Sequence, residues 1–450
     1  MPSGSPNPLR PHPHPELLTK RRRARLAGAA TAVLLALAVP AATAAPAWAA
    51  SEVAGPVAVA TNHRTGLDRP ALDGTLRAFH DAGMYGAYSA VRDGAEEWRG
   101  AAGVADITTG RPTTPDMRHR IGSITKSFTA VAVLQQAGAG RVELDAPIGR
   151  YLPALVPGER GRAITVRMLL NHTSGIGEYT HEIFAAPDSL ETNRFRQFDP
   201  RELARLGLKA KPLGKPGQAH HYANTNYVIA GLLLRKITGE SPEKYITDHV
   251  IRKAGLRHTY FPRSPHITGP HAKGYEAAFG AYDPPRDFSV YNMSWAGTAG
   301  SLISTTADLN QFYRSLLRGE LLAPAQLREM KKTVPVEGDS TVRYGLGLLS
   351  MKLPYGEFWG HNGKVPGSMT WSLSSTDGKR QLSLGFNLTN YQELDDNNLP
   401  IPGRIDTAMK AHLIQALCGK ENGASKVGLR PGGTSSDVPL WPEAAGARDQ

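Results

Sequence analysis

Strand patterns occur near both ends of the chain, and helix patterns fill the region between them. Residues 87–103 read as two strands around Asp93-Gly94, a residue pair that is typical of a tight hairpin turn. The other strand patterns lie at residues 344–349, 369–374 and 381–387. Since both ends supply strands, we predict one α/β lobe from about residues 50–140 and 300–420. A mainly helical lobe would be inserted at about residues 141–299, with a cleft between the lobes.

The sequence predicts several helices and indicates where each begins and ends. Residues 127–136 are mostly apolar, and Gly138 can end this helix. Residues 225–237 carry a broad apolar face, and residues 405–417 form the stripe of a final amphipathic helix. Thr305 is expected to cap a further helix. These helices would flank the predicted strands.

The first 49 residues have the pattern of a secretory signal peptide. A basic cluster at residues 20–25 precedes an apolar stretch at residues 26–39, and Ala47-Trp48-Ala49 offers a small-residue cleavage site. The apolar stretch is short for a membrane span, so we expect secretion without a stable membrane anchor. The sequence leaves both the Sec and the twin-arginine route open. Residues 421–450, rich in Gly, Ser, Pro, Ala and charge, are predicted to be a disordered tail.

The composition excludes several classes of protein. Hydrophobic residues make up 40% of the chain and charged residues 20%, as in an ordinary folded protein. Removing residues 1–49 takes away six basic residues and one acidic residue, so the formal charge falls from +12 to +7. No pattern predicts binding to nucleic acid, and we expect a monomer. Cys418 is the only cysteine, which excludes an internal disulfide. It lies at the end of a predicted helix, so we take it as a packing residue and not as a nucleophile or metal ligand.

Ser123-Ile124-Thr125-Lys126 brings a hydroxyl and an amine within reach of each other where a helix is expected to begin. Residues three positions apart share a helix face, so the Lys126 amine can reach the Ser123 hydroxyl. The helix start also favours a developing oxyanion, which suits a serine nucleophile activated by lysine. The spacing alone is a weak signal, because Ser241-Pro242-Glu243-Lys244 repeats it. There Ser241 reads as a helix N-cap, followed by a proline at the first helical position.

Two further motifs carry residues suited to the same chemistry. Tyr222 can relay protons near a lysine, and Asn224 can bind a substrate amide, although the pair could instead be a packed ring and a helix cap. His361-Asn362-Gly363 follows a strand pattern. There Gly363 would let a substrate backbone approach, although it could instead be a strand bulge. None of these motifs is decisive alone.

The motifs that begin at Ser123, Tyr222 and His361 have the order, separations and local context found in serine β-lactamase-like enzymes. The chain therefore resembles that family. Its closest resemblance is to the soluble, secreted D-alanyl-D-alanine carboxypeptidases related to class C β-lactamases. The similar segments are residues 121–136, 171–175, 222–226, 344–348, 360–363 and 418–420. The resemblance covers about residues 60–420 and implies a β-lactamase/transpeptidase-like antiparallel sheet, flanked by helices, with an inserted helical lobe.

The resemblance also implies roles for individual residues. Ser123 would be the nucleophile that becomes acylated, and Lys126 and Tyr222 would handle protons. Asn224 would contact the substrate amide, and His361 would lie on the strand beside the cleft. Gly363 would lie on the same strand. The backbone N–H groups of Ser123 and Lys364 would together form the oxyanion hole. Phe184 and Trp295 would be aromatic residues of the cleft wall. No metal or organic cofactor is implied, and the substrate would be a small peptide or β-lactam-like molecule, such as a cell-wall peptide stem.

The chain departs from the carboxypeptidase pattern where the substrate carboxylate should bind. Leu349 stands nearest to the position of an arginine that grips this carboxylate. Lys364 replaces a threonine, and Asn362 replaces a small hydroxyl residue. We hypothesise that Lys364 anchors the carboxylate as a point charge. A D-alanyl-D-alanine carboxypeptidase is thus the expected activity. An esterase, a β-lactamase or a non-catalytic binder of β-lactams or cell-wall peptides are the alternatives.

Overall fold

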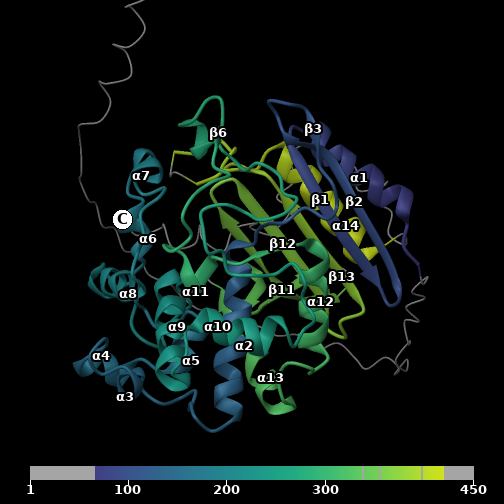
Figure 1. Ribbon diagram of the computed structural model, residues 1–450. Coiled ribbons are helices and arrows are strands. Elements are labelled where there is room, and N and C mark those ends of the chain that lie inside the picture. Colours follow the sequence, from purple (N-terminus) through teal and green to yellow (C-terminus); the bar gives the residue numbers. More distant parts are fainter. Residues whose placement is uncertain (1–65, 337–338, 354–355, 397–398, 420–450) are drawn as a thin grey trace, which may run out of the picture. The chain divides into compact units, whose positions relative to one another are not determined.

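The computed structural model describes residues 66–419, except for residues 337–338, 354–355 and 397–398. The predicted signal peptide at residues 1–49 and the predicted tail at residues 421–450 lie outside the described residues. Along the sequence of the described part, a strand-rich segment comes first, a helix-rich segment follows, and a second strand-rich segment comes last (Figure 1). The predicted α/β fold with a helical insertion is therefore confirmed.

The main sheet has nine strands, and all of its paired strands are antiparallel. The strand order is β3-β2-β1-β13-β12-β11-β10-β9-β8. The strands are β1 (Gly86–Asp93), β2 (Glu96–Asp106), β3 (Arg111–Pro112), β8 (Val334–Val336), β9 (Asp339–Tyr344), β10 (Leu349–Leu353), β11 (Gly356–Val365), β12 (Ser368–Ser375) and β13 (Arg380–Phe386). Because β1 pairs with β13, strands far apart in the sequence share one sheet, as predicted.

The predicted hairpin turn at Asp93-Gly94 is present, and a second hairpin turn joins β12 and β13. Gly94, between β1 and β2, has a φ of 59°, and Gly378, between β12 and β13, has a φ of 69°. Such positive φ values are strained for residues with a Cβ atom, so glycine is favoured at these turns. The shorter strand pairs are β4 (His119–Arg120) with β7 (Ile303–Ser304), and β5 (Tyr275–Glu276) with β6 (Arg286–Asp287) and β14 (Leu388–Thr389).

Helices cover both faces of the main sheet. α1 (Arg69–Asp81) and α14 (Arg404–Cys418) lie side by side against β1, β2 and β13 (Figure 1). α12 (Thr306–Leu317) packs on the opposite face, where the Asn310 amide donates to the Ala90 carbonyl. Neighbouring residues of a strand point to opposite faces, and Ser89 accordingly reaches His412 of α14. Thr305 caps α12 as predicted, because its hydroxyl accepts from the Asp308 N–H.

The helical insertion packs around two long helices, α9 (Asn224–Thr238) within it and α2 (Thr125–Gly138), which precedes the predicted start of the insertion at residue 141. The remaining helices are α3 (Ile148–Tyr151), α4 (Gly158–Ala163), α5 (Val166–Leu170), α6 (Tyr179–Ile183), α7 (Pro187–Thr192), α8 (Pro200–Lys209), α10 (Pro242–Ile246), α11 (Gly297–Gly300) and α13 (Pro324–Met330), with short helical turns η1 (Gly122–Ile124), η2 (Thr247–Ile251) and η3 (Ala278–Gly280). The ends of α2, α9 and α14 agree with the predicted helices to within two residues. No helix in the described part of the chain has the length and apolarity needed to span a membrane.

The predicted strand at residues 344–349 is wrong. β9 ends at Tyr344, and β10 begins at Leu349, so the residues between them form a bend. Gly347 in this bend has a φ of 71°, and a Cβ atom there would lie 2.6 Å from that of Ala130 in α2. The apolar residues of the bend are buried against α2, which explains why their sequence resembles a buried strand.

Candidate active site

Ser123 lies on a short turn between a strand and a long helix. β4 leads into the 3-10 turn η1, and α2 begins at Thr125. The sequence predicts Ser123 at the start of the α-helix itself, whereas the structure places it one short turn earlier. Ser123 is buried, with 8% of its surface exposed. A serine at such a strand-to-helix junction is placed as a nucleophile is in related folds.

Two glycines let this turn lie against β11. Gly122 has a φ of 51°, and a Cβ atom there would come within 2.7 Å of the Lys364 backbone nitrogen. A Cβ atom on Gly363 would lie 2.0 Å from the Ile121 carbonyl oxygen and 2.7 Å from the Ser123 nitrogen. Real Cβ atoms do not come this close to backbone atoms. The glycines therefore permit the contact that brings the Ser123 and Lys364 backbones together.

Lys126 is completely buried on the first turn of α2. Its amine donates to Ser123 Oγ over 2.9 Å, as the spacing predicts. It also donates to Asn224 Oδ1 over 2.7 Å and to the Ala299 carbonyl over 2.8 Å. The Tyr222 ring centroid is 4.8 Å from Nζ. Three acceptors match the three N–H donors of a lysine ammonium, so the amine is held in one position.

Asn224 is the first residue of α9, and its side chain does not cap that helix. Its Oδ1 accepts from Lys126, and its backbone N–H donates to Glu178 Oε2. Glu178 Oε1 accepts from the Thr180 N–H over 2.9 Å. Burial raises the pKa of Glu178, although these N–H donors and the nearby Lys126 act in the opposite direction. Sequence reasoning missed Glu178 because its contact with Asn224 joins residues 46 positions apart.

His361 lies on β11, two residues before Gly363 and therefore on the same face of the strand. Its Nε2 is 2.9 Å from the Tyr344 hydroxyl, and its Nδ1 is 2.5 Å from the Asn362 carbonyl. Burial, together with the charge of Lys126, lowers the pKa of His361 to about 3. The ring is therefore neutral at pH 7, and its two nitrogens contact Tyr344 and Asn362.

The second half of β11 has one open edge. β10 pairs with β11 only as far as Gly360, which lies opposite Leu349. β12 pairs with the other edge of β11 through Val365. Residues 361–365 therefore lack a strand partner on the β10 side among the described strands. An extended substrate can add to such an edge through backbone hydrogen bonds.

The Lys364 side chain leaves the strand on the face opposite to Gly363. Its amine donates to Asn390 Oδ1 over 3.0 Å and lies 5.8 Å from the centroid of the Phe279 ring. The Glu276 carboxylate is close enough for the charge of Lys364 to lower its pKa, although burial raises that pKa overall. Leu349, the counterpart of the family arginine, is buried in the apolar core.

Phe184 and Trp295 come together although they are far apart in the sequence. Their ring centroids are 5.0 Å apart with the rings perpendicular, an edge-to-face contact. The Tyr179 hydroxyl donates to the Trp295 carbonyl over 2.5 Å. Both rings are half-buried, so each keeps exposed apolar surface. Their role as substrate-binding residues stays a prediction.

Ser241, which has the same spacing to a lysine, is a helix cap. Its hydroxyl accepts from the Lys244 N–H over 3.2 Å, and α10 follows. The Lys244 amine is engaged by Glu240 and Asp248 instead. The structural interpretation of this second motif is therefore confirmed.

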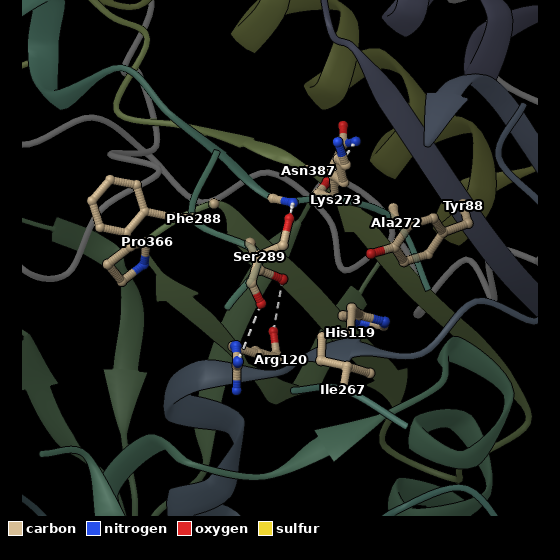
Figure 2. A pocket seen from close by; sticks show the side chains of 13 residues that line it. Tyr88, His119, Arg120, Ile267, Ala272, Lys273, Phe288, Ser289, Pro366 and Asn387 are labelled. Carbon is tan, nitrogen blue, oxygen red and sulfur yellow. Dashed lines mark hydrogen bonds between the residues drawn. The ribbon is translucent and has the colours of Figure 1, made fainter. Parts of the chain in front are cut away.

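A small cavity of about 20 Å³, lined by both polar and apolar residues, lies beside β4. Figure 2 shows Tyr88, His119, Arg120, Ser289 and Asn387 among the residues that line it. The predicted site residues do not line this cavity, and we assign no substrate to it. The residues that the structure describes contain no group of three or more His, Cys, Asp or Glu side chains that could hold a metal ion.

Comparison with known proteins identifies the family. A family model described as Beta-lactamase matches residues 72–394. The structure is similar to that of a D-stereospecific amidohydrolase from Streptomyces sp., with a TM-score of 0.69 and 34% identity, covering 79% of this chain and 100% of that one. It is also similar to D-amino acid amidase from Ochrobactrum anthropi SV3, with a TM-score of 0.65 and 27% identity, covering 76% of this chain and 96% of that one.

Among relatives found by sequence, penicillin-binding protein 4* from Bacillus subtilis (strain 168) is 27% identical over 290 residues, or 62% of this chain. The chain spans 63% of the length of that protein, and 41% of the length of protein flp from Staphylococcus aureus (strain MW2), which is 28% identical over 47% of this chain. The family model covers more than half of the chain. The protein therefore belongs to the beta-lactamase and penicillin-binding protein family.

Proposed function

We propose that the protein is a secreted serine amidohydrolase that cleaves amide bonds of D-configured aminoacyl substrates through an acyl-enzyme on Ser123. The observation that carries this proposal is the position of the Lys126 amine, 2.9 Å from Ser123 Oγ. The choice of substrate class is supported by the similarity to a D-stereospecific amidohydrolase, at 34% identity over the whole of that chain.

The surroundings of Lys126 suit a general base. A neutral lysine amine has two N–H donors and one lone pair. Asn224 Oδ1 and the Ala299 carbonyl can accept both N–H groups, which leaves the lone pair directed at Ser123 Oγ. When the amine takes the serine proton, its third N–H faces the same oxygen. Both protonation states thus have their hydrogen bonds satisfied, as a base that cycles between them requires.

The reaction would proceed in two steps. Ser123 Oγ attacks the amide carbonyl and passes its proton to Lys126. The oxyanion is stabilised by the backbone N–H groups of Ser123 and Lys364, which the close contact between η1 and β11 holds near each other. Tyr222, whose ring lies beside Lys126, gives its hydroxyl proton to the leaving amine as the C–N bond breaks, and the Lys126 ammonium returns the serine proton to Tyr222. Water then attacks the ester, and the released acid leaves Ser123 free.

A second candidate is the D-alanyl-D-alanine carboxypeptidase activity that the sequence resemblance implies. The half-buried Lys364, directly after Gly363 on the open edge of β11, supports it, because a cation could bind the substrate carboxylate there. Against it stands the hydrogen bond of this amine with Asn390 and the presence of Glu276 nearby. Hydrolysis of D-aminoacyl amides needs no residue that binds a substrate carboxylate, so we favour the amidohydrolase function.

Two measurements test the proposed function. Intact-mass analysis after incubation with a penicillin should show one covalent adduct on the wild type and on Ser241→Ala, and none on Ser123→Ala. D-phenylalanine amide should then be hydrolysed with a kcat/KM at least roughly tenfold above those of L-phenylalanine amide and N-acetyl-D-Ala-D-Ala. Preference for the dipeptide would favour the carboxypeptidase, and preference for a short-chain ester or a cephalosporin would favour an esterase or a β-lactamase. Failure of every compound to form an acyl-enzyme would favour a non-catalytic binder.

Export and oligomeric state belong to the same proposal. The basic and apolar segments before Ala49 support secretion. Protein recovered from the culture medium should begin near Ala50, and light scattering should give the mass of a monomer. Retention of residues 1–49 on the exported protein would contradict the predicted cleavage.

A further inference from the structure

His172 is a buried histidine outside the predicted catalytic set. It follows α5 and the helix-ending residue Asn171, and it is completely buried. Its φ of 60° lies in the left-handed region, which residues with a Cβ atom occupy at a cost. Surrounding contacts must hold the residue in this conformation.

Those contacts converge on the segment that carries Tyr222 and Asn224. The His172 carbonyl accepts from the His221 N–H over 2.8 Å. Its ring Nδ1 accepts from the Ala223 N–H over 3.2 Å and lies 3.1 Å from the Asn226 side-chain nitrogen. The backbone is thus tied to one residue, His172, immediately before and immediately after Tyr222.

The ring of His172 also packs on the ring of Tyr222. Their centroids are 4.2 Å apart, and the planes are tilted by 31°. The ring centroid of Tyr344, whose hydroxyl contacts His361, lies 4.9 Å from the ring centroid of His172. Aromatic packing of this kind restricts the rotation of the tyrosine ring.

The hydrogen bonds define which form of the His172 ring is present. Burial, with the nearby charges of His220, Lys126 and His361, lowers its pKa well below the usual value. Since Nδ1 accepts an N–H, the proton of the neutral ring is on Nε2. A proton on Nδ1 would oppose the Ala223 N–H and break this bond.

We propose that His172 is a positioning residue that sets the orientation of Tyr222 and Asn224 over the Lys126 amine. This inference rests on the proposed function of Ser123. Within the described residues, the hydrogen bonds and ring contacts of His172 are with groups other than Ser123, so it would act through the segment that carries Tyr222 and Asn224. A displacement of about 1 Å at reacting groups can cost about 100-fold in rate.

Two substitutions separate the hydrogen bond from the ring contact. His172→Asn keeps an acceptor near the Ala223 N–H and tolerates positive φ, but it loses the ring. His172→Phe keeps a ring but leaves that N–H without an acceptor. His249 offers a matched control, because its ring lies 4.2 Å from that of Tyr245 at an angle of 30°, on an exposed face. It contacts the far end of α2, since its carbonyl accepts from Gln135.

The experiment measures the rate of Ser123 acylation by a penicillin, together with kcat and KM for D-phenylalanine amide. We expect His172→Phe to lower acylation and kcat by about 100-fold with KM changed less than about threefold. His172→Asn should have an acylation rate and a kcat at least about tenfold higher than those of His172→Phe. His249→Phe and His249→Asn should stay within about twofold of the wild type.

Acylation at the wild-type rate in both His172 variants, with the wild type itself labelled, would overturn the inference. If the wild type forms no acyl-enzyme, the proposed function fails instead, so the two failures are distinguishable. Should a His172 variant not fold, ¹⁵N NMR of histidine in the wild type provides an independent test. A His172 ring at pH 7 that is protonated on Nδ1 would contradict the acceptor role.

Discussion

The way in which Lys126 is held determines whether Ser123 can react. Asn224 Oδ1 and the Ala299 carbonyl occupy two directions around the amine, and Ser123 Oγ occupies the third. Asn224 is held in turn by Glu178, a buried carboxylate that accepts its backbone N–H. Each of these contacts is short, but the residues come from η1, α2, α9, α11 and, for Glu178, the residue before α6. The reactivity of the serine is therefore a property of their packing.

A carboxylate in place of the Asn224 amide should change the pH dependence of the reaction. Asn224→Asp puts a negative charge at hydrogen-bond distance from the Lys126 amine, which favours the charged amine over the neutral base. We expect kcat/KM at pH 7 to fall by roughly 10- to 100-fold and the acidic limb of its pH profile to move to higher pH. The measurement is kcat/KM for D-phenylalanine amide between pH 5 and 10.

Asn224→Ala is the comparison for this experiment, since it removes the acceptor without adding charge. It should lower kcat/KM without the shift of the acidic limb. Equal pH profiles for the two variants would show that the charge beside Lys126 has no influence on catalysis.

Between elements, the decisive contact is that of η1 with β11. Gly122 and Gly363 allow the two backbones to approach more closely than any side chain would permit. The same stretch of β11 has an open edge, because β10 ends its pairing at Gly360. The oxyanion site and the substrate-binding edge would therefore be built from one strand.

Gly363→Ala should remove most of the activity. The new Cβ atom would lie 2.0 Å from the Ile121 carbonyl oxygen, so η1 must move away from β11. We expect a loss of at least roughly 100-fold in kcat, as for removal of one oxyanion-hole donor. Gly74→Ala in α1 is the control, because a Cβ atom there meets no atom within 4 Å. It should keep full activity and raise stability by about 0.5–1 kcal/mol. Wild-type kcat for Gly363→Ala would contradict the close-contact model.

Lys364→Ala tests whether the side chain binds a substrate carboxylate. If it does, kcat/KM for N-acetyl-D-Ala-D-Ala should fall by at least roughly tenfold, as expected for a lost charged hydrogen bond. The value for D-phenylalanine amide, which lacks a carboxylate, should change by less than about threefold. We favour the amidase reading and therefore expect equal, small effects on both substrates. A selective loss on the dipeptide would support the carboxypeptidase instead.

Across the whole described chain, the two sequence ends are joined by a buried histidine. His412 of α14 lies 2.8 Å from the Thr75 hydroxyl of α1 through Nδ1, and 2.9 Å from the Ser89 hydroxyl of β1 through Nε2. Burial lowers its pKa from 6.5 to about 4. Because the folded pKa is the lower one, the unfolded chain takes up a proton first as the pH falls. The contribution of the neutral His412 ring to the free energy of unfolding is therefore complete above pH 6.5. It is lost as the pH falls from 6.5 to about 4.

Acid should therefore destabilise the protein partly through His412. The shift of His412 corresponds to at most roughly 3 kcal/mol of the free energy of unfolding. His412→Asn should be less stable than the wild type at pH 7.5, and the difference between the two should narrow towards pH 4.5. Urea unfolding at both pH values measures this. An exposed control, His249→Asn, should follow the wild type at each pH, and a constant difference for His412→Asn would exclude the assigned role.

Much of this could be predicted from the residues. The hairpin around Gly94 and the helices around residues 127–136, 225–237 and 405–417 follow from turn chemistry and apolar spacing, which act between near neighbours. The contact of Ser123 with Lys126 was also predictable, since it spans three residues. The prediction of a strand at residues 345–348 is wrong, because burial against α2 gives this bend the apolar composition of a strand.

The sequence by itself determined the local elements and, through three ordered motifs, the family and the nucleophile predicted within it. Only the tertiary structure decided which groups surround Lys126, that Glu178 supports Asn224, and that His172 holds the Tyr222 segment. It also decided that the Lys364 amine meets Asn390 rather than an open cleft. The physical reason is that local signals depend on neighbours a few residues apart. These contacts join residues 26 to 173 positions apart, except for the bond of Lys126 with Ser123, and depend on how the elements pack.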